Sequence, residues 1–261
     1  MRSDEDRRWE AVSELHGRGT PRTLALVQAL ARGASWRRRA LAMDIAAQLR
    51  EPRRGRARFE GPAFAPEETR AILFAGLADA HAKVVGSAVS GFGHRSDPRA
   101  VPLIAALATH PDAVMRLCVA FALGTHAEPV AMAALMRLAR DADSDVRDWA
   151  TFGLGTQQDT DSPELRALFW TNAHDADRDV RGEALVGLAR RKDPRAVALV
   201  RERLDDDCRV YELEAARELA DAALLDRLQS LRAEATADGS LSGYWLDCLD
   251  EAIAACGRPP A

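Results

Sequence analysis

The sequence predicts an all-α fold, a right-handed α-solenoid (superhelix) of about six and a half antiparallel helix pairs. Three observations predict it: one pattern recurs at nearly constant spacing, prolines mark successive helix starts, and the apolar residues are mainly Ala, Leu and Val. The chain of 261 residues is 47% hydrophobic but only 5% aromatic, which suits closely stacked helices. A period of this length is typical of stacked helix pairs, since one pair alone cannot bury its apolar face.

The clearest copy of the pattern runs from Asp141 to Gly155 and is expected to form the turn and second helix of one repeat. Its copies, aligned on one apolar position, lie 31, 31, 34 and 31 residues apart, at Val84, Met115, Val146, Val180 and Tyr211. Small or apolar residues follow four, eight and nine positions later: Ala88, Val119, Ala150, Ala184 and Ala215; Phe92, Leu123, Leu154, Leu188 and Leu219; Gly93, Gly124, Gly155, Ala189 and Ala220.

The N-terminal part predicts a capping half-repeat and a first full pair. Residues 4–16 are expected to form one helix, and 21–31 and 35–49 the pair, with Ser35 as an N-cap. Residues 50–66 then break the period with prolines, glycines and arginines, which predicts an inserted loop.

From Pro66 onward the array is regular. Pro66, Pro98, Pro129, Pro163 and Pro194 are expected to open successive first helices, where the missing N–H of proline costs nothing. Asp97, Ser162 and Asp193 can cap three of them. We therefore expect one repeat domain: a cap and first pair over 1–49, the loop over 50–66, regular repeats over 67–220, and a C-terminal capping pair over 221–256.

Charge and cysteine content bound the environment. Through Arg58 the chain carries 14 basic and seven acidic residues, a net charge of +7, whereas the remainder carries −11. This asymmetry suggests two surfaces with different electrostatic partners.

The four cysteines form no C-x-x-C pair, and neither a long apolar run nor an apolar signal core occurs, so a cytoplasmic protein without membrane contact is expected.

An acidic and a basic residue recur six positions apart in the turns, as in Asp141 with Arg147 and Asp175 with Arg181. With the D-P-R-A-V starts at Asp97 and Asp193, this resembles HEAT repeats, and in particular the short HEAT-like class found in phycobilin lyase subunits. The resemblance implies a scaffold or adaptor that holds protein partners, with an Asp/Arg ladder tying neighbouring repeats together. Because Val85 and Glu212 replace the basic residue, the ladder is expected to weaken at both ends.

Catalytic and metal-binding patterns find little support. The aspartates that begin at Asp141 and Asp175 open like calcium loops, but the required glycine and glutamate positions hold other residues, so helix capping is expected. The chain has no His-Glu dipeptide of the kind that HEAT-like di-iron enzymes carry, and no nucleotide-binding or nucleophile motif. We therefore expect no enzymatic activity and no cofactor.

The expected function is a protein-interaction scaffold that binds a protein or peptide on the concave face, which the second helices line. Residues three, six and ten positions after each anchor share one stripe of those helices. The predicted partner-binding residues are Cys118, Phe121, Trp149, Phe152, Glu183, Val186, Arg190, Glu214 and Arg217. Whether Phe121, Trp149 and Phe152 line the groove or pack between repeats is left open, as is the oligomeric state.

Two other functions are weighed. Arginines of the N-terminal region could bind the phosphates of a nucleic acid: Arg37, Arg38, Arg39, Arg53, Arg54, Arg56 and Arg58. The overall acidity of the chain counts against this. The resemblance alone also raises a lyase-like, chromophore-handling subunit.

Overall fold

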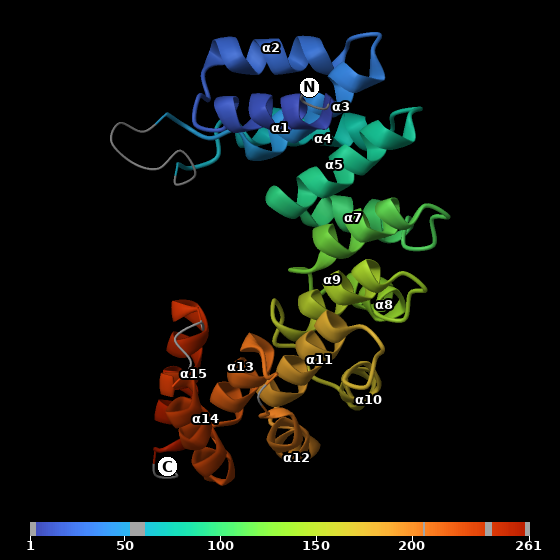
Figure 1. Ribbon diagram of the computed structural model, residues 1–261. Coiled ribbons are helices and arrows are strands. Elements are labelled where there is room, and N and C mark those ends of the chain that lie inside the picture. The colour runs from blue at the N-terminus through green and yellow to red at the C-terminus, as the bar shows by residue number, and fades with distance from the viewer. Residues whose placement is uncertain (1–3, 53–60, 206, 238–241, 259–261) are drawn as a thin grey trace. The chain divides into compact units, whose positions relative to one another are not determined.

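The computed structural model describes residues 4–52, 61–205, 207–237 and 242–258 (Figure 1). By contact density the chain divides into two compact units, Met1–Ala134 and Leu135–Ala261, and each is described by itself. None of the helices in these described stretches combines the length and the apolar character needed to cross a bilayer.

The first unit contains α1 to α7 and the start of α8. Their bounds are α1 (Asp4–Leu15), α2 (Pro21–Ala31), α3 (Trp36–Gln48), α4 (Pro66–Leu77), α5 (Ala82–His94), η1 (Pro98–Ala100), α6 (Val101–Ala105), α7 (Ala113–Leu123) and α8 (Pro129–Leu138). Each first helix packs on the second helix of its own pair, and the second helices α3, α5 and α7 pack side by side.

The second unit repeats this arrangement. Its helices are α9 (Ser144–Gly155), α10 (Pro163–Asn172), α11 (Arg178–Arg190), α12 (Pro194–Arg203), α13 (Val210–Leu219), η2 (Ala222–Leu224), α14 (Leu225–Ala237) and α15 (Gly243–Cys256). The second helices α9, α11, α13 and α15 form one continuous layer, with each helix packed on the next. The described residues thus form α1 and seven pairs. The elements expected from the sequence, a cap, a first pair, five pairs opened by prolines and a capping pair, add up to the same number, so the total of about six and a half was one pair too low.

The helix starts confirm the sequence prediction at every proline, because α4, η1, α8, α10 and α12 each begin at one. The expected caps also form. Asp97 and Asp193 accept hydrogen bonds from backbone N–H groups two residues on, at 2.9 and 3.1 Å, and Ser162 accepts one from Leu165 at 3.1 Å. Ser35 occupies the N-cap position of α3, but its side chain makes no capping bond.

The inserted loop is tied down at its base. The backbone N–H groups of Gly19 and Phe64 donate to the carbonyls of Arg50 and Leu49, at 2.8 and 3.0 Å, and Glu51 N–H donates to Pro62 at 2.9 Å. These bonds close the loop where it leaves and rejoins the helices. Residues 53–60, the rest of the loop, lie outside the described residues.

Glycines in the second helices leave room for rings from the next repeat. A methyl group on Gly93 would lie 2.3 Å from Cε1 of Phe121, and one on Gly182 would lie 2.2 Å from Cδ2 of Tyr211. These separations are far below van der Waals contact, so each ring occupies the space that a side chain would need and packs directly on the glycine backbone. The aromatic residue of one second helix is therefore seated by a glycine of the preceding one.

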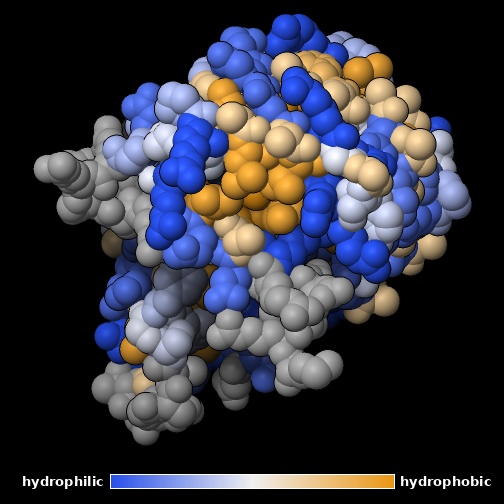
Figure 2. All heavy atoms as spheres, turned by 90° about the horizontal axis from the view of Figure 1, so that it is seen from above, coloured by the Kyte–Doolittle hydropathy of each residue, from blue (hydrophilic) through white to orange (hydrophobic). Residues whose placement is uncertain are grey.

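The N-terminal end of the first unit presents an apolar surface. Seen from the side on which α2 lies, Figure 2 shows a group of hydrophobic side chains bordered by hydrophilic ones. On α2, Ala25, Leu26 and Ala29 are exposed, Leu26 by 51%. The capping helix α1 packs against α3 instead. Its Arg8 donates to Asp44 of α3 at 2.5 Å and to Ser87 of α5 at 2.6 Å.

The predicted ladder between repeats is present within both units. Arg147 pairs with Asp175 of the next repeat at 2.8 Å, and Arg39 pairs with Asp79 at 2.6 Å. The second pair lies in the N-terminal unit, near the end where the sequence predicted a weak ladder. That prediction missed the pair because it did not align the first repeat with the others.

Two buried arginines add a second kind of link. Arg95, one residue after α5, donates to the carbonyls of Ala46 and Leu49 at 3.1 and 2.9 Å. Arg191, one residue after α11, donates to five carbonyls, among them those of Leu154 at 2.7 Å and Gly155 at 3.2 Å. Each guanidinium satisfies the free carbonyls at the C-terminal end of the preceding second helix.

Candidate functional site

The predicted partner-binding stripe divides between the two units. In the first unit, Cys118 and Phe121 are both half-buried. The Phe121 ring lies on Gly93 and makes an edge contact with His94 at 5.1 Å between ring centres. Burial raises the pKa of the Cys118 thiol, so this thiol is not activated as a nucleophile. For Phe121 these contacts favour packing between repeats.

In the second unit the stripe is partly accessible. Trp149 is 38% exposed, and its ring meets that of Phe152 edge-on at 5.9 Å between centres. Val186 is only 4% exposed, which corrects its predicted place on a binding surface. The side chain is covered because α11 has a second helix packed on either side.

The two arginines of the stripe are engaged in ion pairs. Arg190 pairs with Asp159 at 3.0 Å, and it lines a small separate pocket of about 260 Å³ beside Arg191 and Lys192. Arg217 pairs with Glu251 of α15 at 2.8 Å and with its neighbour Glu218 at 3.4 Å. Arg217 thus connects α13 to the capping pair.

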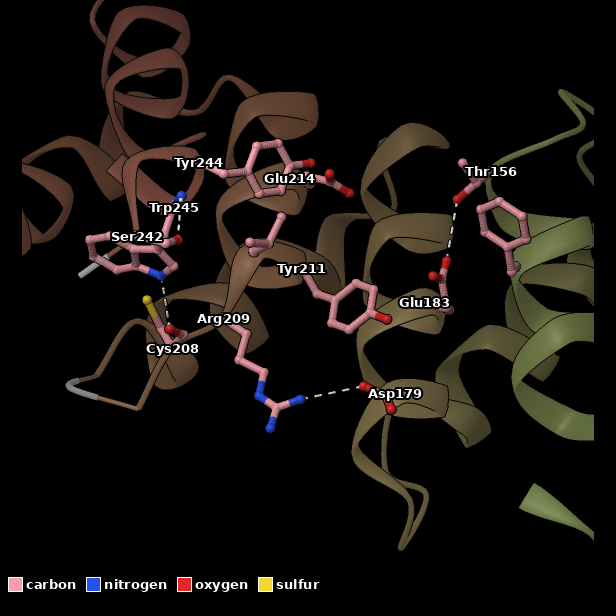
Figure 3. A pocket seen from close by; sticks show the side chains of 12 residues that line it. Thr156, Asp179, Glu183, Cys208, Arg209, Tyr211, Glu214, Ser242, Tyr244 and Trp245 are labelled. Atoms are coloured by element: carbon pink, nitrogen blue, oxygen red, sulfur yellow. Dashed lines mark hydrogen bonds and ion pairs between the residues drawn. The ribbon is translucent and has the colours of Figure 1, made fainter. Parts of the chain in front are cut away.

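The remaining stripe residues meet in a pocket of about 600 Å³ on the layer formed by α9, α11, α13 and α15 (Figure 3). We call it the aromatic pocket, because four of its twelve lining residues carry aromatic rings. The lining residues are Phe152, Thr156, Asp179, Glu183, Cys208, Arg209, Val210, Tyr211, Glu214, Ser242, Tyr244 and Trp245. Of the nine predicted partner-binding residues, Phe152, Glu183 and Glu214 lie here.

Local structure fixes the walls of this pocket. The Tyr211 ring rests on Gly182. Ser242 caps α15 by accepting a hydrogen bond from the backbone N–H of Trp245 at 3.2 Å, and the indole N–H of Trp245 donates to the carbonyl of Cys208 at 3.1 Å. The first turn of α15 is therefore held against the loop that precedes α13.

The pocket is acidic. Arg209 is its one basic lining residue, and it lies 3.5 Å from Asp179. Glu183 and Glu214 have no lysine or arginine within ion-pair distance in the described part of the chain. The Glu183 carboxylate accepts a hydrogen bond from the hydroxyl of Thr156 at 3.4 Å.

Burial and like charges shift the carboxyl groups. Burial, followed by the charges of Asp148 and Glu214, raises the pKa of Glu183 to about 8. Burial, followed by the charge of Asp179, raises the pKa of Asp148 to about 6. Burial also raises the pKa of Glu214. At neutral pH Glu183 therefore holds a proton for most of the time.

The residues whose aromatic rings line the pocket do not follow from the repeat pattern, apart from Phe152. Tyr211 was aligned with buried valines, and Tyr244 and Trp245 lie in the capping pair, which does not follow the repeat pattern. One signal was available for Tyr211: it is the only aromatic residue in its column, and Gly182 precedes it by nearly one period.

The arginines considered for nucleic-acid binding are only partly placed. Arg37 and Arg38 are exposed on α3, and the Arg37 guanidinium lies 4.6 Å from the ring centre of Trp36. Arg39 is engaged with Asp79 and with the carbonyls of Gly33 and Ala34. Arg53, Arg54, Arg56 and Arg58 lie outside the described residues.

The aspartates that resemble calcium ligands act as helix caps. Asp143 accepts hydrogen bonds from the N–H groups of Asp145 and Val146, at 3.0 and 3.3 Å, and Asp177 does the same one repeat later. This confirms the capping interpretation. Among the residues placed by the structure, no three His, Cys, Asp or Glu side chains come together as metal ligands.

Comparisons with known proteins agree with this fold. Residues 71–155 match the family model of HEAT repeats. The YibA protein of E. coli, known from an X-ray structure, superposes with a TM-score of 0.67 at 22% identity, over 99% of this chain and 93% of its own. A crystallised engineered protein gives a TM-score of 0.55 at 13% identity, over 91% of this chain and 69% of its own.

A more distant structure is that of human deoxyhypusine hydroxylase in complex with glycerol, with a TM-score of 0.37 at 17% identity, over 97% of this chain and 91% of its own. A search of curated proteins found no match. The family-model match and the likeness to YibA show the fold, an all-α solenoid of HEAT-type helix pairs. The phycobilin-lyase-type subclass stays a prediction.

Proposed function

We propose that this chain is a protein-interaction scaffold that holds a segment of a protein partner in the aromatic pocket, with no catalytic step of its own. The observation that carries the proposal is the pocket itself. It gathers four rings in one place, although the chain has only 5% aromatic residues. Aromatic side chains dominate the energetics of protein interfaces, so such a gathering favours partner binding.

The position of the pocket supports an extended ligand. Residues of four second helices line it. One exposed aromatic ring lies in the pocket and another lies beside it. Tyr244, at the first turn of α15, is 63% exposed, and Trp149, one turn before Phe152, is 38% exposed. Large exposed rings are unfavourable in water unless a partner covers them. A segment that crosses both α11 and α13 would cover both rings.

The setting of this function is a reducing compartment, which we take to be the cytoplasm. The four cysteines are free, and Cys208, Cys248 and Cys256 are buried. Buried free thiols are usual for proteins that fold where disulfides are not formed.

Nucleic-acid binding remains the competing proposal, and it has less support. This proposal depends on seven arginines, of which the structure describes three. Arg37 and Arg38 are exposed, whereas Arg39 belongs to the ladder. Retention on mixed-sequence DNA or RNA at low salt, abolished by Arg37→Ala with Arg38→Ala, would favour it over protein binding.

Site-specific photo-crosslinking in extract of the native cell tests the scaffold function. A benzophenone amino acid replaces Tyr244 at the pocket, and in the control it replaces Ala198, which is exposed on the first helix α12. We expect a discrete crosslinked protein from the Tyr244 position that is absent from the Ala198 position and is competed by excess unlabelled chain. Equal crosslinking at both positions, with both variants melting like the wild type, would overturn the proposal.

A further inference from the structure

We propose that the aromatic pocket selects a lysine or arginine side chain of the partner segment, placed between Glu183 and Glu214 and against the rings of Tyr211 and Tyr244. This inference rests on the proposed function and specifies the chemistry of the partner. It follows from the charge of the pocket, from its rings, and from the contacts that its carboxylates lack.

The charge of the lining favours a cation. Asp179, Glu183 and Glu214 face one basic residue, Arg209, and that residue is already opposite Asp179. Neither Glu183 nor Glu214 makes an ion pair among the described residues, although the charge of Arg217 on the same helix acts favourably on Glu214. A cation that enters between them would stabilise the ionised form of Glu183 and make attractive contacts with both carboxylates.

The rings favour an organic cation rather than a simple ion. Tyr211 lies against Gly182 of α11 near Glu183, and Tyr244 lies near Glu214 (Figure 3). A guanidinium or ammonium group is attracted to the face of an aromatic ring, and its alkyl stem packs on apolar surface such as Val210. The carboxylates would pair with the charged group of a basic side chain, and the aromatic rings would lie against that group and its alkyl stem.

The chain itself uses the same pairing elsewhere. The guanidinium of Arg195 lies 4.7 Å from the ring centre of Trp170 while it pairs with Asp193 at 2.8 Å. Arg99 lies 5.4 Å from the ring of Phe74 while it pairs with Asp97 at 2.5 Å. In the aromatic pocket the ring and the carboxylate are present, and the cation would come from the partner.

Protonation couples binding to pH. The titratable and charged groups that face Glu183 are Asp148 on α9, Asp179 on its own helix, Arg209 before α13, and Tyr211 and Glu214 on α13. Because burial and the acidic neighbours raise the pKa of Glu183 to about 8, a cation must displace the proton of Glu183 when it binds near neutral pH. Binding should therefore strengthen as the pH rises from 6 to 9.

Oriented peptide libraries test the selection on the full-length chain. Four libraries with degenerate flanks carry arginine, lysine, citrulline or glutamate at the fixed central position, and captured peptides are sequenced. We expect at least tenfold enrichment of the arginine and lysine libraries over citrulline, and depletion of glutamate. Enrichment of citrulline equal to that of arginine would overturn the inference, because citrulline keeps the shape and loses the charge.

Matched variants locate the effect. The double variant Glu183→Gln with Glu214→Gln should lower the affinity for the best arginine peptide at least tenfold. Glu202→Gln, on the exposed surface of α12, should change it less than twofold. Calorimetry of the wild type in two buffers of different ionisation enthalpy should record proton release at pH 7, and this release should vanish in the Glu183→Gln variant. Equal affinity of the double variant and Glu202→Gln would contradict the inference.

The two proposals fail separately. If Tyr244 crosslinks a partner but the libraries show no preference for a cation, the scaffold function stands and the cation selection is wrong. If the libraries prefer arginine and lysine but no crosslink forms at Tyr244 in extract, the pocket binds cations without serving as the scaffold site.

Discussion

Arg147 and Asp175 join two consecutive repeats through two parallel hydrogen bonds, from Nε to Oδ2 at 2.9 Å and from Nη2 to Oδ1 at 2.8 Å. Nη1 of the same guanidinium donates to the carbonyls of Asp141 and Ala142 in its own turn, at 2.9 and 3.1 Å. One side chain therefore fixes its own inter-helix turn and holds the next turn against it. Both partners are largely buried, so solvent screens this pair less than a surface pair.

Arg147→Ala should lower the free energy of unfolding by about 1–3 kcal/mol, because it leaves a half-buried carboxylate and two carbonyls without their donor. Arg147→Lys should recover only part of this, since an ammonium cannot make the forked contact. Urea denaturation measures both. Arg18→Ala, which breaks an exposed pair with Glu14, should cost about 0.5 kcal/mol or less. Equal losses for Arg147→Ala and Arg18→Ala would refute the structural role.

The same pair makes the folding stability of the chain depend on pH in the acidic range. Burial alone would raise the pKa of Asp175, but the hydrogen bonds from Arg147 and from the N–H of Asp177 hold it below its usual range. A carboxyl group with a lowered folded pKa contributes stability above its unfolded pKa of about 4 and loses it as the pH falls through the folded value. The stability difference between wild type and Arg147→Ala should therefore shrink below about pH 4.

Arg191→Ala should be among the most damaging single substitutions in the second unit, with a loss of about 3 kcal/mol or more. The side chain is only 8% exposed and donates to five carbonyls, which would be left unsatisfied beside a cavity. The adjacent Arg190→Ala is the control, because Arg190 makes one pair with the exposed Asp159. Thermal melting should separate the two variants by several degrees, and similar melting points would disprove this assignment.

Ala220→Gly should stabilise the chain by about 0.5–1 kcal/mol. Ala220 ends α13 with a φ of 51°, a left-handed conformation that glycine adopts without the steric cost of a Cβ atom. Ala78 ends α4 with a φ of −97°, so Ala78→Gly should bring no gain. Chemical denaturation of both variants checks the difference, and a gain at Ala78 as large as at Ala220 would contradict the conformational explanation.

Glu183→Gln should change how stability depends on pH. Because the pKa of Glu183 rises to about 8 on folding, the folded chain binds a proton that the unfolded chain releases above about pH 4.5. The wild type should lose stability, by up to about 5 kcal/mol for a shift of this size, as the pH rises from about 4.5 to 8, and the glutamine variant should lose less. At pH 4 the two should be equally stable. Identical slopes from melting curves across this range would refute the shift.

The sequence predicts features that follow the repeat pattern better than features that depart from it. The prolines and the capping aspartates each act on residues next to them, so their roles follow from spacing alone, and the helix starts and the caps at Asp143 and Asp177 were predicted. The walls of the aromatic pocket were not, because Tyr244 and Trp245 belong to a pair that leaves the pattern. Val186 was misplaced because a helical stripe does not reveal how closely the neighbouring helices cover it.

Each of these rings packs on a glycine of the preceding repeat, so the position at which repeats are cut and rejoined matters. Phe121 needs Gly93, and Tyr211 needs Gly182, so each ring and its seat lie on opposite sides of an inter-helix loop. A repeat excised at its loops would carry a ring without a seat into its new position and would leave a glycine uncovered behind it. To keep each ring with its glycine, a cut must avoid residues 93–121 and 182–211, so it would fall at the end of α7 in the first case and at the start of α11 in the second.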